Sequence, residues 1–285
     1  MRWKGLHLHM RATSLKASWM CALLLVTCLV GCLGGGDGNA EDSPISMNVH
    51  YDATSGTIIE RIQDGLSISQ SGVELTFDFA RVTSKAGSMK TFSFDPGDDD
   101  DGVNTITENA NEQTELTYTY QTHGLFTAAL SATDESNNSA SININIRIDK
   151  EIDWTETNTN QPRQMTVSTV PDCTCESPEK ITIDSTIENP PEVITSPQTT
   201  VTWHLLDPDE EEQASHTEQI GDGQEAAWTH NQYNIGSGDW TLDVSIDAGN
   251  DSINIHHVVY ILYEASESEP NPLDVDGPER EKDSL

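Results

Sequence analysis

Alternation of apolar and polar residues with a period of two runs through the first half of the chain. In the clearest case, Val73, Leu75 and Phe77 are separated by single polar residues. Side chains at such spacing point to opposite faces of a strand, so one face is buried and the other is wet. The pattern predicts an all-β fold of antiparallel β-sandwich type. It recurs, with Gly, Asp and Asn turns between the segments, in 88–95, 115–120, 124–134 and 139–149.

Residues 92–134 carry the most specific motif in the chain. "FSFDPGDDDDG" is followed by "YTYQTHGLFTAALSATD". Together they resemble the PKD (polycystic kidney disease) domain, which shows an aromatic-Asp-x-Gly-Asp-Gly turn and then a "TYxxxGxYTVTLTVTD" stretch. The positions that match are Phe94, Asp95, Gly97, Asp98, Tyr118, Tyr120, Gly124, Phe126, Leu130 and Asp134.

The resemblance covers roughly residues 45–150 and implies an Ig-like β-sandwich. PKD domains occur in surface proteins and beside secreted enzymes, and they are usually non-catalytic. The sequence departs from the family at three points. Phe94 replaces the usual Trp, Pro96 replaces an aromatic residue, and the turn swells to four consecutive Asp. The match therefore indicates a fold more strongly than a function.

A second strand-rich segment follows, and it predicts a second Ig-like sandwich in tandem. The stretch 238–246 aligns with 124–132, so that Gly238 falls on Gly124 and Trp240 on Phe126. Each stretch then turns into an Ile-rich strand, which is the signature of a weak internal repeat. The candidate strands of this segment are 165–170, 180–187, 199–207, 238–249 and 252–264.

The N-terminus predicts a lipoprotein leader. Residues 2–18 include four basic and no acidic residues, and the apolar run 19–31 is too short to span a bilayer comfortably. The run ends in Leu29-Val30-Gly31-Cys32, which resembles the lipobox of bacterial and archaeal lipoproteins. The resemblance implies that Cys32 becomes the first mature residue and carries the lipid. An uncleaved anchor helix and an ordinary secretory signal are the alternatives, and both also place the remaining chain outside the cytoplasm.

These patterns divide the chain into five parts. The last part, "SESEPNPLDVDGPEREKDSL", is charged, aperiodic and Pro-containing, which is typical of disorder. The expected parts are a signal peptide (1–31), a lipidated Cys with a flexible tether (32–44), a PKD-like sandwich (45–150), a second sandwich (151–265) and a disordered acidic tail (266–285).

Charge narrows the range of partners. The chain has 48 acidic against 14 basic residues, for a formal net charge of −34. Such a surface repels nucleic acids and anionic lipid headgroups, so nucleic-acid binding is excluded as a function class. An acidic coat that keeps the protein soluble in a salty medium is the favoured interpretation, and it suits a salt-adapted microbe.

The acidic turn is a candidate Ca²⁺ site, because hard cations bind several carboxylate oxygens. It lacks the alternating ligands and distal Glu of an EF-type loop, so a solvated hairpin tip is the favoured interpretation. No other cofactor is expected. Asn137 and Asn250 begin short glycosylation sequons on predicted turns. The candidate cation ligands are Asp95, Asp98, Asp99, Asp100 and Asp101.

Apart from Cys32, two cysteines lie outside the leader, Cys173 and Cys175. Residues two apart lie near the limit for a disulfide, yet an oxidising compartment favours one over free thiols. A soft-metal site with His ligands is the alternative, although no CxxC or HxxxH pair supports it. The His residues of this half are His204, His216, His230, His256 and His257.

No catalytic motif is present: the chain has no nucleophile elbow, no HExxH, no P-loop and no Rossmann glycine pattern. We therefore expect a non-catalytic, membrane-anchored protein of an archaeal or bacterial cell surface, with a binding, adhesion or spacer role. Its expected partners are the membrane, other envelope proteins and glycans. A solute- or carbohydrate-binding component is the alternative, and an envelope metalloprotein is less favoured. The aromatic residues that would stack on a sugar, or else fill the core, are Trp154, Trp203, Trp228, Trp240 and Tyr233.

Overall fold

The computed structural model describes residues 43–98, 102–171, 173, 175–191, 198–249 and 252–273. The chain divides into two units, Met1–Asp42 and Ser43–Leu285, and everything below concerns the second. The predicted leader, Cys32 and most of the predicted tether lie outside the described residues, as does 274–285 of the predicted tail.

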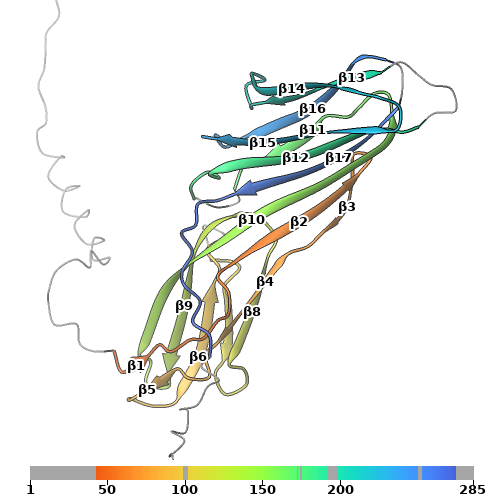
Figure 1. Ribbon diagram of the computed structural model, residues 1–285. Coiled ribbons are helices and arrows are strands. Elements are labelled where there is room, and N and C mark those ends of the chain that lie inside the picture. Colours follow the sequence, from red (N-terminus) through yellow and green to blue (C-terminus); the bar gives the residue numbers. More distant parts are fainter. Residues whose placement is uncertain are drawn as a thin grey trace, which may run out of the picture. The chain divides into compact units, whose positions relative to one another are not determined.

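The described residues form strands and no helix, which confirms the all-β prediction (Figure 1). No helix that could span a membrane occurs among them. The strands are β1 (Ile45–Ser46), β2 (Ser55–Gln63), β3 (Leu66–Gln70), β4 (Val73–Asp78), β5 (Thr83–Ser84), β6 (Met89–Asp95), β7 (Ile106–Asn109), β8 (Glu115–Tyr120), β9 (Gly124–Asp134), β10 (Ser139–Thr159), β11 (Met165–Ser168), β12 (Lys180–Asn189), β13 (Thr199–Leu206), β14 (Glu212–Ile220), β15 (Gln224–Tyr233), β16 (Asp239–Ala248) and β17 (Ile253–Leu262).

The central element is β10, a single strand of 21 residues. At about 3.3 Å per residue it is roughly 70 Å long. Its first half pairs with β9, from Ser139 to Ile148, and its second half pairs with β17, from Lys150 to Thr159. The boundary predicted between residues 150 and 151 therefore falls inside one strand.

The first sandwich packs β6, β9 and the first half of β10 against the β4–β8 pair. Its core contains aromatic side chains that carry the PKD-like motif. The rings of Tyr120 and Phe126 lie 4.8 Å apart, and the Tyr120 hydroxyl donates to the carbonyl of Pro96 at 2.9 Å. Gly97 has a φ of 70°, and a Cβ there would lie 2.4 Å from the Thr127 carbonyl oxygen, so this turn requires glycine.

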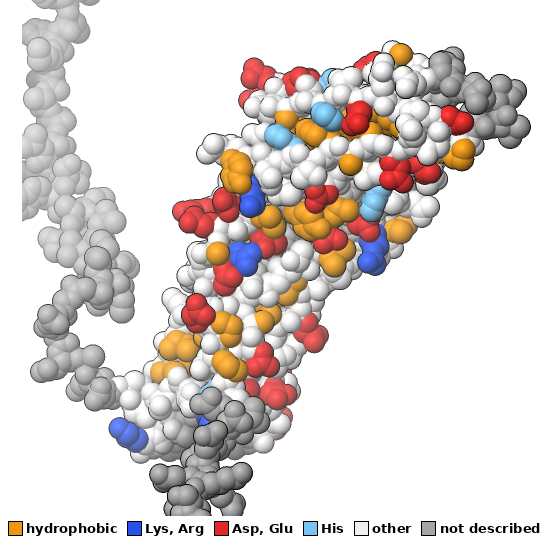
Figure 2. All heavy atoms as spheres, in the orientation of Figure 1, with side chains coloured by type: hydrophobic (Ala, Val, Ile, Leu, Met, Phe, Trp, Pro, Cys, Tyr) orange, Lys and Arg blue, Asp and Glu red, His pale blue; other side chains and the backbone are white. Residues whose placement is uncertain are grey.

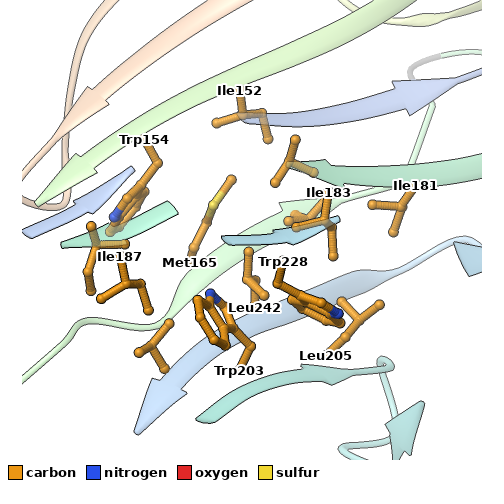
Figure 3. Close-up of a cluster of buried hydrophobic side chains, with 14 of the residues drawn as sticks. Ile152, Trp154, Met165, Ile181, Ile183, Ile187, Trp203, Leu205, Trp228 and Leu242 are labelled. Atoms are coloured by element: carbon orange, nitrogen blue, oxygen red, sulfur yellow. The ribbon is translucent and has the colours of Figure 1, made fainter. Parts of the chain in front are cut away.

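The second sandwich packs the second half of β10 with β17, β12 and β15 against a sheet of β11, β16, β13 and β14. Figure 3 shows its side chains meeting between the two sheets. A buried polar chain crosses this core: Trp203 Nε1 donates to Ser185 Oγ at 2.7 Å, and Ser185 Oγ lies 2.7 Å from His257 Nδ1. His257 is buried, and burial and then the charge of His256 lower its pKa to about 3, so the imidazole in this chain is neutral at pH 7.

One pairing differs from the antiparallel prediction. β2 pairs with β10 in parallel, from Ser55 against Arg147 to Gln63 against Thr155. Parallel strands need a crossover, and here the whole first sandwich forms the connection between β2 and β10. Alternation in a strand reports burial of its faces and carries no information on direction, which is why the sequence did not reveal this pairing.

The start of the predicted disordered tail is also ordered. Residues 263–271, which we call the C-terminal strap, follow β17 and return along the first sandwich. Ser268 N donates to Asn145 O at 2.9 Å, and Asn271 forms a β-bridge with Tyr51. The physical reason is an open edge: β2 covers β10 only from Arg147 onward, so Asn145 finds its backbone partners in the strap.

We expect Phe126→Asp to unfold both sandwiches together. Phe126 is buried in the first core, and an unpaired buried carboxylate destabilises by several kcal/mol or so. Because β10 and β2 serve both cores, the second core should be lost as well. Outside the leader, every tryptophan lies in the second core, so tryptophan fluorescence reports that core alone. Phe126→Leu is the control, and native fluorescence in a Phe126→Asp protein would show that the cores are independent.

Candidate functional site

β10 carries a lysine, Lys150, on its inner face, at the point where that face passes from the first core to the second. Ile144, Ile146 and Ile148 face the first core, and Ile152 and Trp154 face the second. Lys150 occupies the same row between them and is only partly buried. The β4–β8 pair and the sheet of β11, β16, β13 and β14 are separate, and Lys150 lies between the residues of β10 that belong to the two cores.

Lys150 is paired on this face with Glu60 of the neighbouring strand β2. The Nζ–Oε2 distance is 2.7 Å, and both side chains are less than one-fifth exposed. Burial alone would raise the pKa of Glu60, but the hydrogen bond and the charge of Lys150 outweigh burial and hold that pKa below its ordinary value. The Glu60 carboxylate is therefore ionised at pH 7, and Lys150 opposes its charge.

His123, in the loop between β8 and β9, lies over this pair. Its Nδ1 is 2.8 Å from the hydroxyl of Tyr263, the first residue of the C-terminal strap. Burial, and then the positive charge of Lys150, lower the pKa of His123 to about 4. The imidazole is thus neutral at pH 7. Through its contact with Tyr263, it connects the β8–β9 loop of the first sandwich to the end of β17 in the second.

A second polar cluster lies behind Tyr263 and fixes the strap. The Tyr263 amide donates to Asp149 Oδ1 at 2.9 Å, and Asp149 also binds the Arg147 guanidinium. Burial raises the pKa of Asp149. Arg147 then holds Glu267 through two bonds of 2.9 Å each, which is the bidentate geometry that arginine favours.

Lys150 and His123 line a cleft of about 330 Å³. Its polar lining consists of two glutamine amides, a hydroxyl, a neutral imidazole and the Lys150 ammonium, whose charge is opposed by Glu60 beside the cleft. An anionic ligand would have to compete with Glu60 for Lys150, and the lining offers no acidic group to a cation, whereas hydroxyl and amide groups would find both donors and acceptors. The cleft therefore suits a small, uncharged, polar ligand. Its lining residues are Ile58, Gln70, Gln121, Thr122, His123, Lys150, Val170 and Pro171.

Two other hollows of similar size are less suited to binding. One, of about 370 Å³, lies between Asp52 and the strap and is lined by Glu267 and Glu269. The other, of about 380 Å³, is an open depression on the outer face of the second sandwich, beside His256. Figure 2 shows acidic side chains scattered over this face of the molecule, with few basic ones.

The acidic turn is described only in part. Asp95 Oδ1 accepts the Gly97 amide at 3.1 Å, and Asp98 accepts from Asn104 and from the Tyr118 hydroxyl. Asp99, Asp100 and Asp101 lie outside the described residues. In the part of the chain that the structure describes, no group of three or more His, Cys, Asp or Glu could hold a metal ion.

The structure joins Cys173 and Cys175 by a disulfide, with Cα atoms 5.2 Å apart, and Cys173 packs against the first core. Gly124 makes room for it, because a Cβ there would lie 2.7 Å from Cys173 Sγ. Asn137 is exposed in the turn between β9 and β10, with a φ of 62°. Asn250 lies outside the described residues.

Among the described residues, the histidines of the second half form no group that could hold a metal ion. His204 pairs with Glu212 at 2.6 Å, His216 lies against Trp203 and Trp228, and His230 stacks on Trp228. His256 is exposed and His257 is buried, as expected for adjacent strand residues. The four tryptophans belong to the core and do not offer stacking faces, while Tyr233 is half exposed at the end of β15.

Sequence reasoning missed Lys150, Glu60 and His123. The signal for Lys150 was present: the alternation of 142–148 continues through Ile152 and Trp154, so a lysine in that row stands out. No local signal identifies Glu60 or His123. Their roles depend on the parallel pairing of β2 and on a loop that meets the strap.

Comparison with known proteins adds little to this description. No protein-family model matches the chain, and no curated protein matches it significantly. A carbohydrate-binding module of the β-sandwich superfamily matches 66% of this chain and 90% of its own, at 13% identity and a TM-score of 0.26. The CBM51-2 and INT domains of Clostridium perfringens ZmpB, in complex with GlcNAc, match 51% of this chain and 39% of their own, at 13% identity and 0.22.

The glucan-utilisation protein SGBP-B of Bacteroides ovatus, in complex with a mixed-linkage heptasaccharide, matches 73% of this chain and 52% of its own. The identity is 9% and the TM-score 0.19. At TM-scores this low, none of these likenesses carries an argument about function. The PKD resemblance remains a prediction from the sequence motif.

Acid should destabilise the fold through its two buried histidines. In the unfolded chain both titrate near pH 6.5, but in the fold the pKa of His123 is lowered to about 4 and that of His257 to about 3. Between pH 6.5 and 4 the unfolded state therefore binds more protons, and the free energy of unfolding decreases as pH falls. Each group contributes on the order of 3 kcal/mol over this range.

Denaturant melts at several pH values measure this slope. His257→Asn should flatten it, because the group that titrates only after unfolding is gone. His123→Asn, at the other buried histidine, should reduce the slope by a similar amount. Equal slopes in the wild type and the His257→Asn protein would contradict the assignment of a buried neutral imidazole.

Proposed function

We propose that this protein is a non-catalytic lipoprotein of the cell envelope that holds a rigid two-sandwich binding module outside the membrane. The observation that carries the proposal is β10, which runs through both cores without a linker. A strand of about 70 Å, paired along both edges, gives the spacer stiffness that a flexible tandem of domains lacks.

The positions of the chain ends support an oriented display. The strap brings Asn271 beside Tyr51, and the β1–β5 pair near Ser43 belongs to the same first sandwich. Both ends of the described chain therefore leave from the first sandwich (Figure 1). If Cys32 carries the anchor, the chain enters the first sandwich from the anchor, and the second sandwich lies at the other end of β10.

The cleft beside Lys150 favours a small uncharged ligand, with a glycan or another polyhydroxylated solute as the chemistry that fits. Two glutamine side chains, a neutral imidazole, an aliphatic wall and a lysine already paired with Glu60 favour hydroxyl groups over charged ones. The strongly acidic surface would repel anions in any case. This proposal adds a ligand class to the spacer role and does not require a catalytic step.

Cys32→Ser tests the anchor. The lipobox chemistry needs the thiol, so the variant should lose its lipid and leave the membrane fraction or retain an uncleaved leader. Fractionation and the mass of the N-terminal peptide report the outcome. Cys28→Ser, four residues earlier in the same apolar run, is the matched control and should stay lipidated. An unchanged membrane fraction and N-terminal mass in the Cys32→Ser protein would overturn the lipoprotein proposal.

Calorimetric titration with neutral sugars (glucose, galactose, N-acetylglucosamine and cellobiose) tests the cleft. We expect at least one to bind, and Lys150→Met or Glu60→Gln to weaken that binding about tenfold or more, because each leaves the other charge unpaired. Lys90→Met, on the exposed surface of β6, is the control. Binding that survives both cleft substitutions would place the ligand elsewhere, and binding of none of the sugars would remove the glycan proposal while leaving the spacer role intact.

A further inference from the structure

The turn between β9 and β10 presents a side-chain nitrogen that makes no bond within the fold. Asn137 is exposed there, with a φ of 62°, a backbone conformation that asparagine adopts more readily than most residues. Its Oδ1 accepts a bond from Lys90 Nζ at 3.3 Å, and among the described residues its Nδ2 donates none. The neighbouring Asn138 differs, since its Nδ2 donates to Asp134 at 2.9 Å. Of these two adjacent amides, that of Asn137 is the one available for a reaction.

Asn137 is also the first residue of an Asn-x-Ser sequence, in which Ser139 supplies the hydroxyl. Such a sequence on the surface of an exported protein is an acceptor for an N-linked glycan. Ser139 is the exposed first residue of β10, and its Oγ lies 2.9 Å from Thr133 Oγ1 on β9. Both ends of the acceptor sequence therefore lie at the surface of the fold.

The outward side chains of the sheet beside this turn are uncharged. Two rows of them cross β7, β6, β9 and β10 in register, and most carry hydroxyls that bond to one another. Ser93 Oγ lies 2.8 Å from Thr107 Oγ1, and Ser131 Oγ lies 3.0 Å from Ser141 Oγ. We call the two rows the hydroxyl face. The row nearest the turn consists of Asn109, Thr91, Thr133 and Ser139, and the next of Thr107, Ser93, Ser131 and Ser141.

The other outward sheet faces differ, because each carries carboxylates. Glu151 and Asp184 lie on the outer face of the second sandwich's part of the nine-stranded sheet, Glu74 and Glu115 on that of the β4–β8 pair, and Asp239 and Asp243 on that of the β11 sheet. The hydroxyl face thus has no part in the like-charge repulsion that keeps acidic proteins apart. Sugar hydroxyls donate and accept hydrogen bonds as serine and threonine hydroxyls do, so a neutral glycan matches this face without removing a charge from water.

We propose that Asn137 carries a neutral N-linked glycan that covers the hydroxyl face. The donor is an oligosaccharide whose anomeric carbon is bonded to a polyprenyl phosphate. Asn137 Nδ2 forms a bond to that carbon and gives up one proton to water, while the anomeric C–O bond breaks and its electron pair leaves with the lipid phosphate. The inference rests on the extracytoplasmic location proposed above and is independent of the ligand assigned to the cleft.

Mass spectrometry of the full chain purified from its native cells tests the modification. Trypsin cuts after Lys90 and Arg147, and Asn137 begins the only Asn-x-Ser or Asn-x-Thr sequence in the peptide between them. We expect this peptide to carry a glycan mass that is lost in Asn137→Gln and in Ser139→Ala. Ser139→Thr is the matched control: it keeps the acceptor sequence, so its peptide should stay modified.

The N-terminal mass of the same sample separates this inference from the proposed function. A bare 91–147 peptide from a chain that is lipidated at Cys32 would overturn the inference and leave the lipoprotein proposal intact. A chain with neither lipid nor glycan that stays in the cytoplasm would overturn both.

Labelling of an added cysteine tests where the glycan lies. Ser141→Cys, on the hydroxyl face, should react with a maleimide at least about twofold more slowly in the glycosylated protein than in the same protein with Asn137→Gln, because a surface glycan is bulky. Thr117→Cys, exposed on the outer face of the β4–β8 pair, is the control and should react equally in both proteins. Equal rates at Ser141→Cys with and without the glycan would overturn the covering of the hydroxyl face.

Discussion

The pairing of β10 along both of its edges is the constraint on which the rest of the structure depends. β9 and β17 follow one another on one edge, while β2 and then the strap occupy the other. A strand shared in this way transmits register from one core to the next, because a slip of one residue would turn every inner side chain outward in both sandwiches. Two cores that look like separate domains in the sequence thus become one body.

The cleft is a consequence of that arrangement. The nine-stranded sheet packs against the β4–β8 pair at one end and against the β11 sheet at the other. The part of its inner face that lies between these two contacts needs a residue that tolerates partial burial. Lys150 meets this need by pairing with Glu60, and His123 closes the space above by contacting Tyr263. Each contact is local, yet all of them depend on the β2–β10 register, in which Lys150 lies opposite Ile58.

The sequence was sufficient for the fold class and for most strands, because alternation reports directly which face of a strand is buried. It was misleading at residue 150, where a charged residue interrupts an alternation that in fact continues to Trp154. Of the four buried tryptophans, Trp203 and Trp240 lie in strands that the sequence predicted, whereas Trp154 and Trp228 lie in parts of β10 and β15 that it did not. The strap, the parallel pairing and the contacts of Lys150 and His123 could not be predicted from the sequence, since each joins residues 90 or more apart along the chain.

The distance between two spin labels on β10 tests the central claim most directly. Ser139 and Thr157 are exposed and 18 residues apart on this strand, one beside each core. In a protein with Cys32→Ser and cysteine at these two positions, electron–electron double resonance should give one narrow distance near about 60 Å, unchanged between low and high salt. A broad distribution, or one that shifts with ionic strength as two acidic domains swing apart, would show that the sandwiches are joined by a flexible linker and that β10 is not continuous.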